Sequence, residues 1–197
     1  MDAVRRLPNL LSLLRLAAVP GLLGLGWLGL EAGFLVLLGC SLASDVADGW
    51  LARRLRAAST LGARLDSWAD LATYSAVPVA VLWLWPGVVR EERVPIAIAL
   101  VAYALPIAWG WIRFRRLTSY HTRGAKLAAV AMGLGLLALL GLGVATPFRV
   151  ACALLVVEAI EEIAITCVLP RWTADVPSLA HAIAIARAER VRRSDRA

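Results

Sequence analysis

Six long runs of apolar residues constrain what this chain can fold into more than any other feature of its sequence. They cover approximately Leu10–Leu30, Gly33–Ala52, Trp68–Val88, Val94–Trp111, Lys126–Ala145 and Phe148–Leu169. Each is close to the roughly 20 residues that a helix needs to cross a bilayer. Apolar residues make up 60% of the 197 positions, more than a soluble domain of this length can bury. The sequence therefore predicts an all-α integral membrane protein with six transmembrane helices.

The distribution of Lys and Arg predicts how these helices are oriented. With the N-terminus inside, the outer loops hold only Arg90, Arg93 and Arg149 of the 21 basic residues. Basic residues favour cytoplasmic loops, so we expect both termini in the cytoplasm. The net charge of +7 fits this topology and attraction to anionic lipid headgroups, and no basic soluble domain indicates nucleic-acid binding.

The sequence shows no linker, repeat or second domain. We expect one membrane domain over residues 1–197, in which residues 170–197 form a cytoplasmic amphipathic and basic tail. The expected location is the inner (cytoplasmic) membrane of a bacterium, in which the chain is a multi-pass integral protein.

Four aspartates lie at the cytoplasmic ends of the second and third runs. Asp45 and Asp48 are three residues apart, and Asp66 and Asp70 are four apart. On helices, each pair therefore shares one face. A short loop joins the two runs, which makes them antiparallel neighbours. We expect the four carboxylates to converge in an active-site cavity at the cytoplasmic face.

Four converging carboxylates repel one another unless a cation lies among them. Oxygen donors without His or Cys are typical of a site for Mg²⁺ or Mn²⁺. Two such ions about 4 Å apart can bind a phosphate during in-line displacement. Gly49, Ala52 and Gly62 leave room for a ligand beside the acids, and Arg53 offers a fork for phosphate oxygens. These residues together predict a diphosphate site with two metal ions.

The acids and the small residues around them form one motif. It reads Asp45-x-x-Asp48-Gly49-x-x-Ala52-Arg53, eight further residues, then Gly62-x-x-x-Asp66-x-x-x-Asp70. At every fixed position it resembles the signature of the CDP-alcohol phosphotransferase family. The chain length and the six predicted spans are also similar to those of the family.

The resemblance implies a role for each residue of the motif. The four aspartates would bind two ions of Mg²⁺ or Mn²⁺, and Asp70 would also be the catalytic general base. The residues that would line the CDP site are Gly49, Ala52, Arg53 and Gly62. The implied reaction belongs to phospholipid biosynthesis: a phosphatidyl group passes from CDP-diacylglycerol to an alcohol acceptor, and CMP is released. The resemblance also implies a homodimer with one active site in each protomer.

The acceptor stays open between glycerol 3-phosphate, which we favour, and serine or another small alcohol. Residues 8–15, PNLLSLLR, resemble the start of phosphatidylglycerophosphate synthases, which use glycerol 3-phosphate. Residues 62–78 are more similar to phosphatidylserine synthases, because Ser67 and Leu71 replace the Pro and Lys usual in the glycerophosphate enzymes. A phosphorylated acceptor would need cations. The candidates are Arg116, Arg123 and Lys126, which could equally be cytoplasmic anchors of the spans.

Two further features leave alternatives open. Arg15 lies about two turns inside the first span, where a charge usually faces a partner or a cavity. We favour a brace between Arg15 and the glutamates of the sixth span, and the alternative is that these residues line the acceptor pocket. Those glutamates are Glu158, Glu161 and Glu162. The four aspartates could also line a small cation transporter or channel, although their clustering at one face favours the enzyme.

Overall fold

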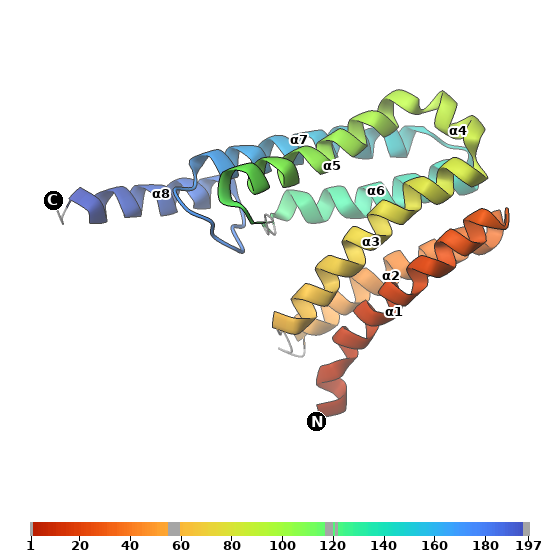
Figure 1. Ribbon diagram of the computed structural model, residues 1–197, viewed down its shortest axis with the longest axis horizontal. Helices are drawn as coiled ribbons and strands as arrows, with labels where there is room; N and C mark the ends of the chain where they lie inside the picture. Colours follow the sequence, from red (N-terminus) through yellow and green to blue (C-terminus); the bar gives the residue numbers. More distant parts are fainter. Residues whose placement is uncertain (1, 55–59, 117–119, 121, 195–197) are drawn as a thin grey trace. The chain divides into compact units, whose positions relative to one another are not determined.

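The structure is a computed structural model that describes residues 2–54, 60–116, 120 and 122–194 (Figure 1). Within the helices, side chains are not described for residues 2–9, 48–54, 60, 61, 63, 64, 66, 67, 123 and 191–194. Over the described residues the chain forms eight helices and no strand. It divides into an N-terminal unit, Met1–Glu91, and a C-terminal unit, Glu92–Ala197. The single membrane domain expected from the sequence stays a prediction.

The N-terminal unit is built around its first helix. Its elements are α1 (Asp2–Trp27), α2 (Glu31–Arg54), α3 (Thr60–Leu84) and α4 (Pro86–Glu91). Helix α1 packs against both α2 and α3, and the core between them includes the buried side chains of Leu22, Phe34 and Leu38. A Cβ atom on Gly26 would lie 2.9 Å from the Cβ of Ala80. The absence of a side chain at Gly26 therefore lets α1 and α3 approach closely.

The C-terminal unit is organised around α7. Its elements are α5 (Arg93–Phe114), α6 (Arg123–Leu142), α7 (Thr146–Val168) and α8 (Leu179–Ser194). Helix α7 packs against the other three. A Cβ atom on Gly135 of α6 would lie 2.8 Å from the Cα of Phe148, so a glycine is needed where α6 meets α7. Helix α6 ends at Gly143, whose φ of 69° is readily adopted only by glycine.

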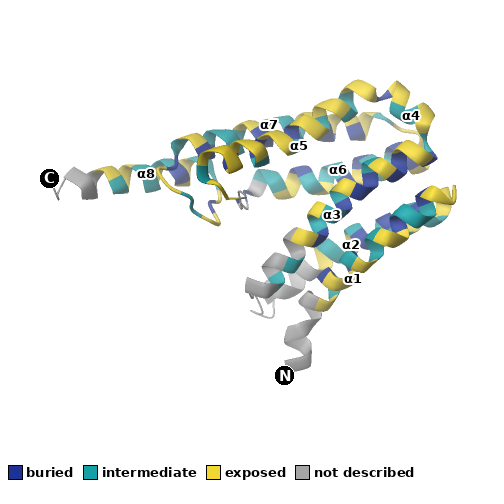
Figure 2. Ribbon diagram, in the orientation of Figure 1, coloured by how far each residue is buried: buried dark blue, intermediate teal, exposed yellow. Residues whose placement is uncertain are grey.

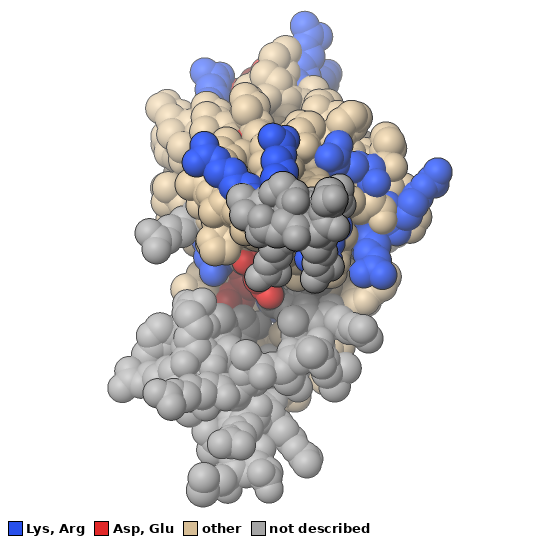
Figure 3. All heavy atoms as spheres, turned by 90° about the vertical axis from the view of Figure 1, so that its left-hand side faces the viewer, with Lys and Arg blue, Asp and Glu red and all other residues tan. Residues whose placement is uncertain are grey.

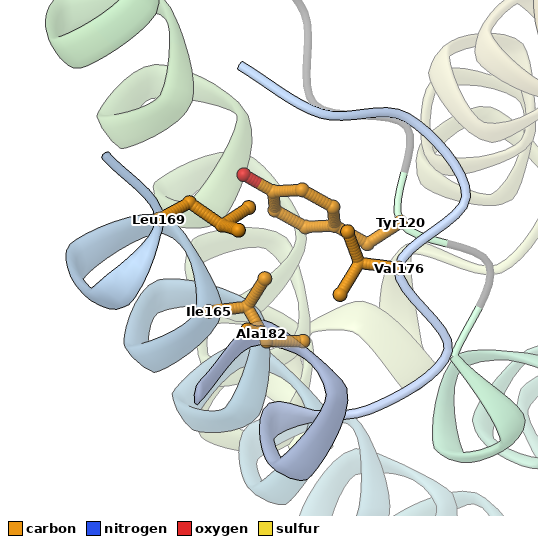
Figure 4. Packing of buried hydrophobic residues seen from close by; sticks show 5 residues of the cluster. All are labelled: Tyr120, Ile165, Leu169, Val176 and Ala182. Carbon is orange, nitrogen blue, oxygen red and sulfur yellow. The ribbon is translucent and has the colours of Figure 1, made fainter. Parts of the chain in front are cut away.

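The segment after α7 packs back onto the C-terminal unit. Ala182 of α8 and Val176 of the preceding loop join Ile165, Leu169 and Tyr120 in one buried cluster (Figure 4). The apolar side of the amphipathic tail predicted from the sequence is thus covered, at least in part, by protein rather than by lipid.

The six apolar runs correspond to α1, α2, α3, α5, α6 and α7, and the short helix α4 was not expected. Among the described residues, three segments are long and apolar enough to cross a membrane: Leu10–Trp27, Arg93–Phe114 and Gly124–Leu142. Exposed residues occur along the helices of both units (Figure 2). Many of them are large and apolar, with Leu142 at 78% and Trp27 at 76% exposed. Surfaces of this kind suit lipid contact rather than water. The helical membrane class is therefore supported, while six spans and cytoplasmic termini stay predictions.

Candidate functional site

Asp45 and Asp70, the two predicted metal ligands whose side chains are described, come together at one guanidinium group. Asp45 lies on α2 and Asp70 on α3. The Nη1 atom of Arg15, on α1, lies 2.5 Å from Asp45 Oδ1 and 2.8 Å from Asp70 Oδ1. Three helices therefore contribute one charged side chain each to a single cluster.

The packing of α1 explains why the cluster forms. Because α1 contacts both α2 and α3, a side chain on its inner face can reach both neighbours. Arg15 is on that face with Ser12, and its side chain is only 4% exposed, whereas the two aspartates are 36% exposed. A guanidinium buried to this degree needs anionic partners to compensate for its lost hydration.

These partners differ from those that the sequence favoured for Arg15. We expected a brace with the glutamates of the sixth span, but the arginine contacts acids of its own unit. The glutamates have local partners: the Thr122 hydroxyl donates to Glu158, and the Leu179 amide donates to Glu161 at 3.1 Å. The expected brace to the glutamates of the sixth span stays a prediction.

A small cavity adjoins the Arg15 cluster. It has a volume of about 10 Å³ and is lined by Arg15, Ser41, Leu42, Asp45, Asp70, Thr73 and Tyr74. Space of this size accommodates about one water molecule. The hydroxyl of Thr73, one turn after Asp70, is buried beside it without a hydrogen-bond partner in the described part of the chain.

The remaining motif residues are only partly within the described structure. Asp48, Gly49, Ala52 and Arg53 belong to α2 and Asp66 belongs to α3, but their side chains lie outside the described residues. Gly62 is half-buried in the first turn of α3. Helical spacing places Asp48 one turn after Asp45 and Asp66 one turn before Asp70. Among the side chains described, no group of three acids, histidines or cysteines is placed to hold a metal.

The predicted acceptor-binding residues lie in the C-terminal unit. Arg116 is exposed, and its guanidinium lies 5.2 Å from the centre of the Trp172 ring, a cation–π contact. Lys126 is exposed in the first turn of α6, and the Arg123 side chain lies outside the described residues. Basic side chains gather at the end of this unit where α5 ends and α6 begins (Figure 3). The exposed ones are Arg113, Arg115, Arg116, Lys126, Arg171, Arg187 and Arg190.

Comparison with known proteins agrees with the motif. The model of the family described as CDP-alcohol phosphatidyltransferase matches residues 5–164. The chain belongs to this family.

Two curated relatives of this family member are similar over part of their length. The chain is 37% identical over 112 residues to "Cardiolipin synthase (CMP-forming)" of Streptomyces coelicolor, covering 52% of the chain and 47% of that protein. It is 33% identical over 133 residues to "CDP-diacylglycerol--glycerol-3-phosphate 3-phosphatidyltransferase 1, chloroplastic" of Oryza sativa subsp. japonica, covering 61% of the chain and 40% of the relative. The chain thus spans less than half the length of either relative. No solved structure matches it.

The described acids of this family member are compatible with a divalent cation. Carboxylate oxygens are the donors that Mg²⁺ and Mn²⁺ prefer. Asp45 and Asp70 come from different helices, yet each has an oxygen within 2.8 Å of the same nitrogen, so one cation can reach both. The guanidinium already provides positive charge between them.

Sequence reasoning missed how the loop between α5 and α6 is anchored in this family member. Thr122 is fully buried, caps α6 by accepting from the Ala125 amide at 2.9 Å, and donates to Glu158. Tyr120 is buried with its hydroxyl 3.2 Å from Thr166 Oγ1, and burial raises the pKa of its phenol. A threonine just before a helical segment is a sequence signal for a helix cap, but it does not reveal the glutamate.

Proposed function

We propose that this protein transfers the phosphatidyl group of CDP-diacylglycerol to the hydroxyl group of an alcohol and releases CMP. The observation that carries the proposal is the family match over residues 5–164, which contain the complete four-aspartate motif. The contact of Asp45 and Asp70 with one cationic group supports it further. The family match also favours the transferase over the cation transporter or channel.

The proposed roles follow the motif. Asp45, Asp48, Asp66 and Asp70 would hold two ions of Mg²⁺ or Mn²⁺, which would neutralise the diphosphate and the departing CMP. Gly49, Ala52 and Gly62 would leave space for the CDP moiety, and Arg53 would donate hydrogen bonds to phosphate oxygens. The acyl chains of the donor would remain in the bilayer.

Asp70 would act as the general base. It would accept the proton of the acceptor hydroxyl, whose oxygen attacks the phosphorus nearer the diacylglycerol. The new bond joins this oxygen to phosphorus, the bond from phosphorus to the CMP oxygen breaks, and CMP leaves with the electron pair. We propose no covalent enzyme intermediate, because no Ser, Cys or His in the sequence has an activating partner at motif spacing.

For the acceptor we propose glycerol 3-phosphate. The rice relative is named for this acceptor, and the chain is 33% identical to the part it aligns with. Arg116, Arg123 and Lys126 would bind the acceptor phosphate, which needs a cationic site. We further propose that the protein is a homodimer in the inner (cytoplasmic) membrane of a bacterium.

An acceptor screen tests the proposal. Purified protein with labelled CDP-diacylglycerol and Mg²⁺ or Mn²⁺ receives glycerol 3-phosphate, serine, inositol phosphate or phosphatidylglycerol in separate reactions, and CMP release is followed. We expect release with glycerol 3-phosphate and none after the metal is removed with EDTA. Release with serine or phosphatidylglycerol alone would correct the acceptor, whereas no CMP with any alcohol would refute the transferase.

A further inference from the structure

Arg15 connects the three long helices of the N-terminal unit through one side chain. Its Nη1 donates to Asp45 on α2 and to Asp70 on α3, and both acceptors belong to the proposed metal site. The arginine is almost fully buried, while the aspartates remain partly exposed. The guanidinium is thus the buried part of this cluster, and the carboxylates are its more exposed part.

The space beside Arg15 is small within the described part of the N-terminal unit. The cavity that adjoins it has a volume of only about 10 Å³. A diphosphate is far larger than the single water that fits such a space. We therefore expect Arg15 to act on the reaction through the carboxylates that it contacts.

We propose that Arg15 is a positioning residue of the metal site, which holds Asp45 and Asp70 at the separation at which one cation can bind both. The inference rests on the proposed function, because it assumes that these aspartates are metal ligands. Ligand-orienting partners of this kind generally have strong effects on metal affinity, because a misdirected carboxylate loses its bond to the ion.

The direction in which cation affinity changes when Arg15 is removed distinguishes a positioning role from simple charge neutralisation. If Arg15 merely neutralised the acids, its removal would eliminate a positive charge near the ion and would tighten cation binding. If it positions them, its removal frees two carboxylates to repel each other and weakens cation binding. A lysine keeps the charge but is a point donor on a flexible stem, without the planar fork of arginine. It should therefore also weaken binding, although less.

Mn²⁺ binding to the full-length protein tests the proposal. Wild type, Arg15→Lys and Arg15→Met are purified in detergent, stripped with EDTA and titrated with Mn²⁺ alone, and free Mn²⁺ is measured by electron paramagnetic resonance. We expect a dissociation constant about 10- to 100-fold higher for Arg15→Met, the range usual for the loss of a ligand-orienting partner, and an intermediate value for Arg15→Lys. In the turnover assay, kcat should fall while KM for CDP-diacylglycerol stays close to the wild-type value.

The matched control is Arg90→Met, which removes an exposed arginine from α4 of the same unit, where Nε lies 3.3 Å from the Pro86 carbonyl oxygen. It should bind Mn²⁺ as wild type does. Tryptophan fluorescence on heating checks that each variant is folded. If Arg15→Met does not fold, the comparison rests on Arg15→Lys, which retains the charge.

Three results would overturn the inference. They are tighter Mn²⁺ binding by Arg15→Met, unchanged binding by Arg15→Lys, and a rise in KM for CDP-diacylglycerol without a fall in kcat. Wild-type protein that binds no Mn²⁺ would refute the proposed metal site together with the role of Arg15. Failure of the proposed metal-dependent function can therefore be told apart from failure of the role proposed for Arg15.

Discussion

The two units of the chain both contain acidic side chains within helices, but they neutralise them differently. In the N-terminal unit, Asp45 and Asp70 share the guanidinium of Arg15. In the C-terminal unit, Glu158 and Glu161 accept from groups at the starts of α6 and α8. One cluster depends on a side chain that joins three helices, whereas the other depends on helix N-termini, which favour negative charge.

This difference distinguishes a candidate reaction site from a cluster whose hydrogen bonds hold helices together. Carboxylates that contact Arg15 and remain partly exposed can also bind a metal ion while keeping that contact, because an ionised carboxylate accepts several bonds at once. Carboxylates used as helix caps are held by Thr122 and by a backbone amide, and a ligand would have to break those bonds. We therefore expect changes in the N-terminal cluster to affect catalysis and changes in the C-terminal cluster to affect stability.

The largest expected effect comes from Asp70→Asn. The amide retains the size of the side chain and an oxygen for Arg15, but it cannot accept the acceptor proton. Loss of a general base typically lowers turnover by about 10²- to 10⁴-fold. CMP release measures this loss, which should be far larger than any loss of Mn²⁺ affinity, and CDP binding should be largely retained.

The matched variant in the C-terminal unit is Glu158→Gln, whose amide oxygen can still accept from Thr122. It should retain most of the activity. The contrast between the units fails if Glu158→Gln is as inactive as Asp70→Asn. Equal loss of metal or CDP binding in Asp70→Asn would contradict its assignment as the base.

Two glycine substitutions, one in each unit, test the difference between the units through helix packing. Gly26→Ala places a methyl group 2.9 Å from the Ala80 Cβ, and Gly135→Ala places one 2.8 Å from the Phe148 Cα. Overpacking of this kind costs about 1–3 kcal/mol of stability. Only the first should also weaken Mn²⁺ binding, because α1 carries Arg15. The control is Gly24→Ala, where nothing lies within 4 Å. Equal Mn²⁺ affinity in all three variants would show that the site does not depend on how α1 packs.

Thr122→Val tests the hydrogen bond that the Thr122 hydroxyl donates to Glu158. The substitution preserves shape and leaves Glu158 without its buried donor, so unfolding should become easier by about 1–3 kcal/mol. Thermal unfolding measures the change, with Thr146→Val as an exposed control. Activity per folded molecule should change little, and a higher KM or a lower kcat at unchanged stability would instead place this glutamate in the reaction.

The smallest effect concerns the opposite end of the C-terminal unit. Arg149 donates to both carboxylate oxygens of Glu92, at 2.9 and 2.6 Å, and these hydrogen bonds hold the pKa of Glu92 below its ordinary value of 4.5. Their contribution to stability is present above pH 4.5 and is lost as the pH falls through the lowered pKa. Arg149→Met should therefore have a slightly lower melting temperature than wild type at neutral pH. The difference between the two melting temperatures should disappear in strong acid. A difference in melting temperature that is the same at both pH values would contradict this pH dependence.

Much of the architecture follows from local sequence patterns. Each apolar run contains a helix because its length and composition leave few alternatives, and the end of α6 follows from Gly143. The partner of Arg15 could not be found in this way. Its acceptors lie 30 and 55 positions away, and nothing in the spacing states that α1 packs against both α2 and α3. The same holds for Glu158, whose donor Thr122 is 36 positions away.

The sequence by itself determined that the chain is helical and apolar, and that four aspartates recur in the order and spacing of its family. These properties are local, because they depend on the period of a helix and on which residue follows which. Only the tertiary structure decided which charge lies beside Asp45 and Asp70. A buried arginine forms hydrogen bonds with the acids that the packing of neighbouring helices brings within about 3 Å of it. That packing depends on contacts such as the one between Gly26 and Ala80 rather than on the arginine itself.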